Sequence, residues 1–252
     1  TTYNSWLNIS SDGEKITFVN QGNIFINSIE EGKIKQLTSF NSECWSPFFS
    51  PDGKEIAFLS GSRDIVIVDT HEGLIQKTFR NIDFGTQLIW SSDSILLYSK
   101  LKDQNFYIFN MISGDRKTLI KNDTEKNSGE MSYPMYSPDR KKFILYWYKW
   151  TGNSGLWLIS SDGSSEKLLF WGQIYPLKWS ENNEMFYAYD FTKNPKEIIK
   201  VSSKNGTVVQ RIKMPSEVDE ADVTPDGKKI VYSIYKETSD VWMIENFDPD
   251  VD

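Results

Sequence analysis

The stretch Phe49-Ser50-Pro51-Asp52-Gly53-Lys54-Glu55-Ile56-Ala57-Phe58 decides the fold. Pro fixes φ at the second position of a turn, Asp accepts hydrogen bonds from its own backbone, and Gly adopts positive φ. Ser-Pro-Asp-Gly therefore predicts a tight reversal between two strands. The apolar residues that follow, Ile56 to Leu59, form a nearly continuous run. Such a run predicts a strand that is covered on both faces.

The same turn motif recurs six times along the 252 residues. Its Asp, replaced by Asn in the fifth copy, recurs at spacings of 40, 41, 46, 43 and 44 residues, at Asp12, Asp52, Asp93, Asp139, Asn182 and Asp226. Each copy is followed by two apolar runs, a turn that usually holds Gly, and a more polar strand. A period near 40 with four short strands per unit is the sequence signature of a β-propeller. No window shows a helical period, so we expect almost no helix.

We therefore predict an all-β, six-bladed β-propeller with four-stranded antiparallel blades, formed by residues 1–252 as a single domain. The predicted repeats cover residues 5–40, 44–80, 86–121, 132–170, 175–213 and 219–247. The last repeat ends after its third strand, because Pro249 and three aspartates make residues 246–252 poorly suited to an outer strand. The sixth blade is predicted to have three strands, or to take its outer strand from a segment upstream of Thr1.

The stretch 49–58 resembles the repeat of TolB-like propellers, and more distantly WD-type repeats. Residues 223–232 and 133–139 are similar to the same repeat, so the resemblance extends over essentially the whole chain. It implies a bacterial binding or sensing domain that holds a protein or peptide across the channel face, in the periplasm or otherwise outside the cytoplasm. The chain begins at Thr1, and we expect it to be a fragment or a processed product of a longer protein.

Composition argues against two classes of partner. The formal net charge is -7 and the Lys and Arg residues are scattered, whereas a nucleic-acid surface needs clustered positive charge. No stretch approaches the ~18 consecutive apolar residues of a membrane-spanning helix, so no membrane insertion of this segment is predicted.

The residues that usually carry catalysis are scarce. His71 is the only His and lies in a polar turn, Cys44 is the only Cys, and no Gly-x-Ser-x-Gly motif occurs. Residues 248–252 alternate carboxylates but lack the Gly and the distal Glu of a calcium loop. We predict no catalytic residues, no metal and no cofactor. Acid–base chemistry by paired carboxylates stays open as an alternative, because Asp and Glu are plentiful.

One pattern lies in the connections that lead into the inner strands. Nine or ten residues before each repeat Asp stand Tyr3, Glu43, Asp83, Glu130, Gln173 and Glu217. Aromatic residues flank these positions, and we predict an acidic, aromatic rim around the channel mouth, made by Glu43, Trp45, Asp83, Phe84, Glu130, Tyr133, Trp171, Tyr175, Glu217 and Asp219. Such a rim would attract a basic peptide. The competing interpretation is that the acids solvate the loops while the aromatics pack between blades.

The longest hairpin between second and third strands, Tyr148 to Gly155, is a second candidate contact, because it carries Lys149 and Trp150. Taken together, the features favour a non-catalytic propeller that engages a protein or peptide, a basic one in particular, at its channel face. Three alternatives remain: a substrate-docking or gating propeller of a larger peptidase, a small-ligand sensor of a regulator, and a carboxylate enzyme.

Overall fold

The structure is a computed structural model that describes residues 6–40, 42–61, 64–82, 88–92, 94–99, 105–121, 129–150, 152–234 and 240–245. Within these ranges the chain forms strands and turns and no helix, as the sequence predicts. It follows that the described residues include no helix that could cross a membrane.

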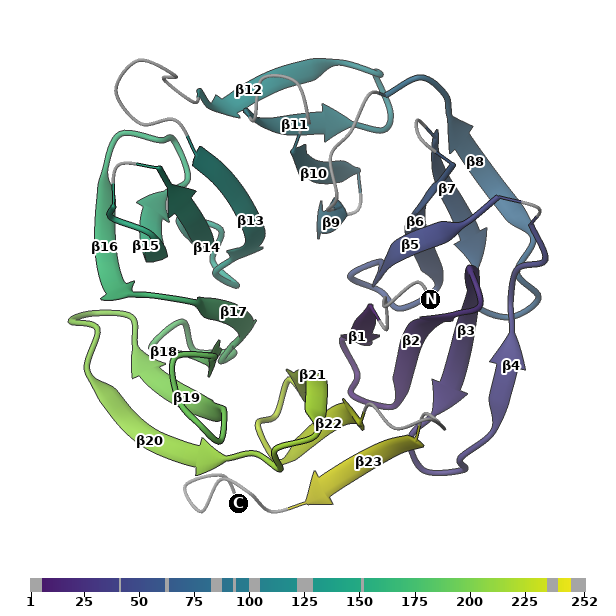
Figure 1. Cartoon of the computed structure of the whole chain (residues 1–252). Coiled ribbons are helices and arrows are strands. Elements are labelled where there is room, and N and C mark those ends of the chain that lie inside the picture. The colour runs from purple at the N-terminus through teal and green to yellow at the C-terminus, as the bar shows by residue number, and fades with distance from the viewer. Residues whose placement is uncertain are drawn as a thin grey trace. The chain divides into compact units, whose positions relative to one another are not determined.

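The chain divides into two compact units. Unit 1 comprises residues 1–101 and 109–115, and unit 2 comprises residues 102–108 and 116–252. Figure 1 labels the strands of both. Unit 1 contains two complete four-stranded antiparallel sheets, formed by β1 (Leu7–Ile9), β2 (Lys15–Asn20), β3 (Asn23–Ser28) and β4 (Ile34–Gln36), and by β5 (Cys44–Phe49), β6 (Glu55–Ser60), β7 (Asp64–Asp69) and β8 (Ile75–Phe79). The boundary between the units runs through a third such sheet, formed by β9 (Leu88–Ser92), β10 (Ile95–Ser99), β11 (Phe106–Asn110) and β12 (Arg116–Ile120).

Unit 2 contains two further four-stranded antiparallel sheets and one of three strands. The four-stranded sheets are formed by β13 (Gly129–Tyr136), β14 (Lys142–Lys149), β15 (Gly155–Ser160) and β16 (Glu166–Trp171), and by β17 (Ile174–Trp179), β18 (Met185–Asp190), β19 (Glu197–Ser202) and β20 (Val208–Lys213). The three-stranded sheet is formed by β21 (Val218–Val223), β22 (Lys229–Ile234) and β23 (Asp240–Glu245). Within the described residues, the last sheet has three strands, which agrees with the prediction of a three-stranded sixth blade.

Burial follows the order of strands in each sheet. The four central residues of β6, β7, β19 and β22 are buried, on both faces of their sheets. The fourth strands are far more exposed, and β4 is exposed at all three residues. Apolar clusters fill the space between successive sheets within each unit; one joins Ile144 and Leu156 to Trp179 and Phe186. The continuous apolar runs of the second and third strands therefore reflect packing against neighbours on both sides.

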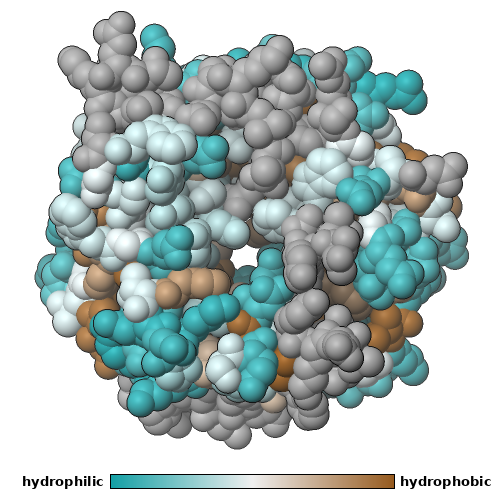
Figure 2. Space-filling model, in the orientation of Figure 1, coloured by the Kyte–Doolittle hydropathy of each residue, from teal (hydrophilic) through white to brown (hydrophobic). Residues whose placement is uncertain are grey.

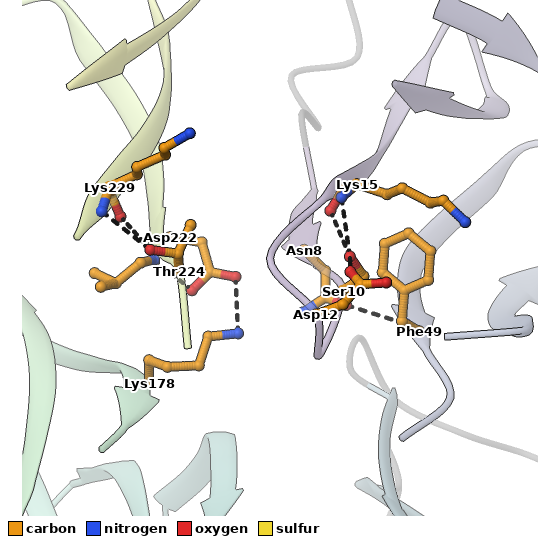
Figure 3. A network of polar contacts seen from close by, with 10 residues as sticks. Asn8, Ser10, Asp12, Lys15, Phe49, Lys178, Asp222, Thr224 and Lys229 are labelled. Carbon is orange, nitrogen blue, oxygen red and sulfur yellow. Dashed lines mark hydrogen bonds and ion pairs between the residues drawn. The ribbon is translucent and has the colours of Figure 1, made fainter. Parts of the chain in front are cut away.

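The repeated turn is held by one set of hydrogen bonds in every described copy. In the second copy the Ser50 hydroxyl donates to Asp52 Oδ1 at 2.7 Å and accepts from the Glu55 amide at 2.9 Å. Asp52 Oδ1 also accepts from the Lys54 amide at 3.1 Å. Figure 3 shows two further copies, built on Ser10 with Asp12 and on Thr224 with its bond to Lys229. The turn thus satisfies its own polar groups and fixes how the first strand meets the second.

Asn182 shows that this turn needs an oxygen acceptor but no charge. The Ser180 hydroxyl donates to Asn182 Oδ1 at 2.7 Å, and Asn182 Oδ1 accepts from the Glu184 amide at 3.0 Å. The fifth copy, which departs from the sequence motif, therefore keeps the geometry of the others. Asp93 of the third copy lies outside the described residues.

Polar contacts also join the first strands of successive sheets within each unit. In unit 1, Asn8 Oδ1 accepts from the Phe49 amide at 3.0 Å. In unit 2, Lys178 on β17 forms an ion pair of 3.3 Å with Asp222 on β21, and both side chains are largely buried. Figure 3 draws both contacts. These pairs add directional links to the apolar contacts between sheets.

The boundary of the fourth repeat differs from the prediction. The repeat is predicted to start at residue 132, whereas β13 begins at Gly129. Its register shifts between Ser132 and Met135, which is a β-bulge, and pairing with β14 resumes on the other side of it. The extra residue of a bulge is not visible in a hydrophobicity pattern, so the sequence suggested a shorter strand.

Hydrogen bonding in the repeated turn predicts an acid-dependent stability. The Ser50 hydroxyl, and after it the Lys54 amide, lower the pKa of Asp52 below its ordinary value of 3.8. Asp139 is lowered in the same way by Ser137 and the Lys141 amide. A carboxylate with a lowered folded pKa stabilises the fold above its unfolded pKa, and this contribution is lost as the pH falls through 3.8 toward the folded pKa.

The double variant Asp52→Asn, Asp139→Asn should fold, as Asn182 indicates, and should lose less stability than the wild type between about pH 6 and about pH 3. Urea unfolding midpoints measured across this range test the expectation. An equal loss in both proteins would show that these carboxylates do not contribute to the acid response.

Candidate functional site

Strand pairing brings two sets of segments to the same end of each sheet in unit 2. The start of the first strand pairs with the end of the second: Glu130 opposes Tyr148, Tyr175 opposes Tyr189, and Val218 opposes Ile234. We call this the connection end. Within the described residues, it carries the connections that lead into β17 and β21 and the hairpins that follow β14 and β18. The Ser–Asp turns lie at the opposite end. The rim and the Tyr148–Gly155 hairpin, which the sequence suggested as separate candidates, therefore share one end of their sheet.

The predicted rim residues are distributed over both units. In unit 2, Glu130 and Tyr133 lie on β13, Tyr175 on β17 and Asp219 on β21, while Glu217 directly precedes β21. In unit 1, exposed Glu43 precedes β5 and half-buried Trp45 lies on it. Tyr3, Asp83 and Phe84 lie outside the described residues.

Trp171 lies at the connection end of its sheet but on a different strand from the other predicted rim residues. It ends β16, the fourth and outermost strand of its sheet, where it pairs with Gly155. Tyr133 and Tyr175 lie on first strands, at the opposite edges of their sheets. Sequence proximity of Trp171 to Gln173 suggested a shared location, but the chain crosses from an outermost to a first strand between them.

A row of aromatic rings crosses from one sheet to the next at the connection end. Tyr175 lies at its centre, with ring centroids 5.0 Å from Tyr133, 4.6 Å from Tyr146 and 5.2 Å from Phe191. Phe191 in turn contacts Tyr189 at 4.5 Å. These spacings are those of favourable aromatic pairs. Tyr133 and Tyr175 were predicted, whereas Tyr146, Tyr189 and Phe191 were missed because they continue the apolar run of a core strand.

Tyr133 adopts a backbone conformation that bulky residues avoid. Its φ is 53°, within the left-handed region, at the bulge of β13. Ser46 occupies the equivalent position of β5, four residues before the turn Ser, with the same φ of 53°. The bulge on β5 therefore forms with the small side chain of Ser46. Folding of the bulge does not require an aromatic residue such as Tyr133 in this strained conformation.

Lys196 links the aromatic row to the last sheet. Its Nζ lies 4.5 Å from the Phe191 ring centroid and donates a hydrogen bond of 2.8 Å to the carbonyl oxygen of Val218.

Burial, and after it the charge of the neighbouring Asp219, raises the pKa of Tyr189 far above its ordinary value. Burial also raises the pKa of Tyr175. Both phenols are therefore neutral near pH 7, and these rings carry no charge of their own beside the carboxylate of Asp219.

Among the side chains whose exposure the structure describes, the exposed aromatic ones all belong to one blade, β13–β16. They are Tyr133, Tyr148, Trp150 and Trp171, with exposed fractions of 38%, 42%, 60% and 65%. Figure 2 shows a largely pale surface over this sheet, the colour of residues of intermediate hydropathy. Tyr148 and Trp150 contact each other edge to face, with centroids 5.0 Å apart. Exposed aromatics gathered in this way are typical of interaction surfaces.

Lys149, predicted as part of the exposed hairpin, is instead buried. Its Nζ lies 3.8 Å from the ring centroids of both Trp147 and Trp157, and 3.9 Å from a carboxylate oxygen of Glu166. Burial lowers the pKa of Lys149, and Glu166 opposes this shift. Successive side chains of a strand point to opposite faces, so Lys149 lies on the side of β14 away from Tyr148.

The residues considered for catalysis lie in ordinary environments. The side chain of His71 is 91% exposed, and its Nδ1 lies 3.9 Å from Glu72. Cys44 is buried on β5, and burial raises the pKa of its thiol to about 11, which favours the unreactive thiol form. No three His, Cys, Asp or Glu side chains of the described ranges are grouped so that they could hold a metal ion.

Comparison with known proteins identifies the fold. No protein-family model matches the chain, and no curated protein matches it. Several solved structures are similar to the chain. TolB from Acinetobacter baumannii is similar with a TM-score of 0.72 at 18% identity over 94% of this chain, which spans 62% of the length of the TolB chain. The β-propeller domain of Myceliophteria thermophila Cps50 (Swd1) has a TM-score of 0.67 at 10% identity, covering 96% of this chain and 97% of that one. Hydrazine synthase of Kuenenia stuttgartiensis has a TM-score of 0.64 at 12% identity, covering 100% and 98%. The chain thus has the fold of a TolB-like, WD-repeat-like β-propeller, with four-stranded antiparallel blades.

The aromatic row should contribute measurably to stability. Tyr175→Leu removes three ring contacts, each worth about 0.5–1.5 kcal/mol beyond burial, and should lower the free energy of unfolding by about 2 kcal/mol. Tyr175→Phe keeps the ring and should change it by less than about 0.5 kcal/mol. Urea unfolding of the two variants provides the comparison. Equal effects would mean that the ring contacts are energetically unimportant.

Proposed function

We propose that this β-propeller is a six-bladed, non-catalytic binding domain that holds a protein or peptide segment against the connection end of unit 2. The observation that carries the proposal is the gathering of exposed aromatic side chains on the blade β13–β16, among the residues whose exposure the structure describes. Tyr133, Tyr148 and Trp150 lie at or near its connection end, where the first strand begins and the second strand ends. Folding alone gives no reason to expose these side chains on one blade only.

The surroundings of the aromatics support binding of a segment that crosses between blades. The aromatic row extends from Tyr133 through Tyr175 to Phe191, and carboxylates follow at Glu217 and Asp219 by the start of β21. Aromatic anchors with polar groups around them are the usual make-up of an interaction hot spot. The compartment that the TolB-type resemblance implies, outside the bacterial cytoplasm, is part of this proposal.

A random peptide library selected on the purified chain tests the proposal. We expect a consensus peptide that binds wild-type protein and loses at least about tenfold in affinity for the double variant Tyr148→Ser, Trp150→Ser, because exposed aromatic anchors dominate such contacts. Trp171→Ser is the matched control. It removes an aromatic of similar exposure from the outermost strand of the same blade, and should bind like the wild type.

Two results would count against this function. The first is a selection that yields no consensus. The second is a consensus whose binding survives Tyr148→Ser, Trp150→Ser and is lost in Trp171→Ser, which would move the contact to the outer edge of the blade.

A further inference from the structure

Strand β14 carries two aromatic sets, one on each face. On one face Trp147 and Trp157 enclose Lys149, and Glu166 completes the set with a carboxylate. Two indole rings and one carboxylate surround the cation there, and the set is buried apart from the half-exposed Glu166. The negative face of an aromatic ring attracts a cation within about 6 Å, which explains why a lysine is tolerated in this position.

The other face of β14 repeats this arrangement without its cation. Tyr148 opposes Glu130 directly across the β13–β14 pair, so the two side chains share a face with Cβ atoms about 5 Å apart. Trp150 contacts the Tyr148 ring edge to face at an interplanar angle of 82°. In such a pair at least one ring keeps an uncovered face, and both residues are exposed. Within the described part of the chain, no Lys or Arg lies over either ring.

The carboxylate of Glu130 favours a positively charged ligand beside these rings. Glu217, Asp219 and Glu220 lie at the connection end of unit 2 as well, at β21, two sheets along the chain. Lys196 at this end is engaged with Phe191 and Val218, while Lys193 and Lys213 are exposed on the sheet β17–β20. A carboxylate beside two open rings selects a cationic group over a neutral or anionic one.

We infer that Tyr148, Trp150 and Glu130 form a binding site for a Lys or Arg side chain, supplied by the segment that the propeller binds. This inference rests on the proposed function and names the chemistry of its ligand. An ammonium or guanidinium group would lie over the open ring face and pair with the Glu130 carboxylate. It would reproduce on this face of β14 the arrangement that Lys149 makes on the other.

Nα-acetylarginine amide and Nα-acetylcitrulline amide are matched probes, because citrulline keeps the shape of arginine and lacks its charge. Protein labelled with fluorotryptophan reports on each indole by ¹⁹F NMR, and Trp150→Phe identifies the Trp150 signal. We expect the arginine amide to shift this signal saturably, and the citrulline amide to bind about two- to fivefold more weakly or not at all. The Trp171 signal, identified by Trp171→Phe, should not move.

Variants separate the two parts of the site. Glu130→Gln should weaken the arginine amide about two- to fivefold at low salt, with a smaller effect at high salt. Tyr148→Leu keeps an apolar side chain, removes the ring, and should weaken it by a similar factor. The dispersion of the remaining ¹⁹F signals shows whether each variant is folded.

The outcomes distinguish this inference from the function on which it rests. Equal shifts of Trp150 by both amides, or an equal shift of Trp171, would overturn the cation site. A Trp150-dependent consensus peptide without Lys or Arg would also overturn it, while leaving the proposed function standing. Saturable binding of the arginine amide alone, without any consensus peptide, would support the site and refute the peptide-binding function.

Discussion

Burial of the second and third strands on both faces is the constraint on which the remaining structure depends. Strands such as β6 and β7 have apolar residues at four successive positions, so a shift by one residue would still present apolar groups to both neighbours. The alternation that normally fixes register is therefore weak in these strands. Register has to come from the turns, and the Ser–Asp hydrogen bonds supply it by joining fixed positions of the first two strands.

Register then decides which side chains meet at the connection end. With the turn at Ser137 and Asp139 fixed, Glu130 falls opposite Tyr148 and Gly129 opposite Lys149. A shift of one residue would place Lys149 opposite Glu130 and would move Tyr148 away from it. The same local turn chemistry that closes the hairpin thus determines, about ten residues away, which carboxylate stands beside the exposed rings.

The repeats were predictable because each rests on local chemistry that a short sequence shows. Ser50-Pro51-Asp52-Gly53 specifies its turn within four residues, and Asn182 could be placed by spacing alone. Tyr133 and Tyr175 were predicted for the same reason, from their distance to the turn. The contact of Tyr175 with Tyr146 and Phe191 was not, because it joins two sheets. The burial of Lys149 and the position of Trp171 on an outermost strand also depend on pairings that no local pattern displays.

Packing between blades explains some of the aromatic residues at the connection end and leaves others unexplained. Packing between blades accounts for Tyr146, Tyr175 and Tyr189, whose rings contact one another or Phe191 and are at least half-buried. It does not account for Tyr148 and Trp150, which pack on each other and remain exposed.

Neither the exposed aromatics of this blade nor the aromatic residue at its bulge is a requirement of the fold. Trp147 and Trp157 of this blade are buried around a lysine, and the bulge at Ser46 forms without a large side chain. Exposed rings on β14 and strain at Tyr133 are therefore two independent costs, and both lie on the first two strands of one sheet. Exposed aromatic rings and a strained aromatic residue are both unfavourable for the isolated blade. We interpret them as features of a contact surface rather than as requirements of folding.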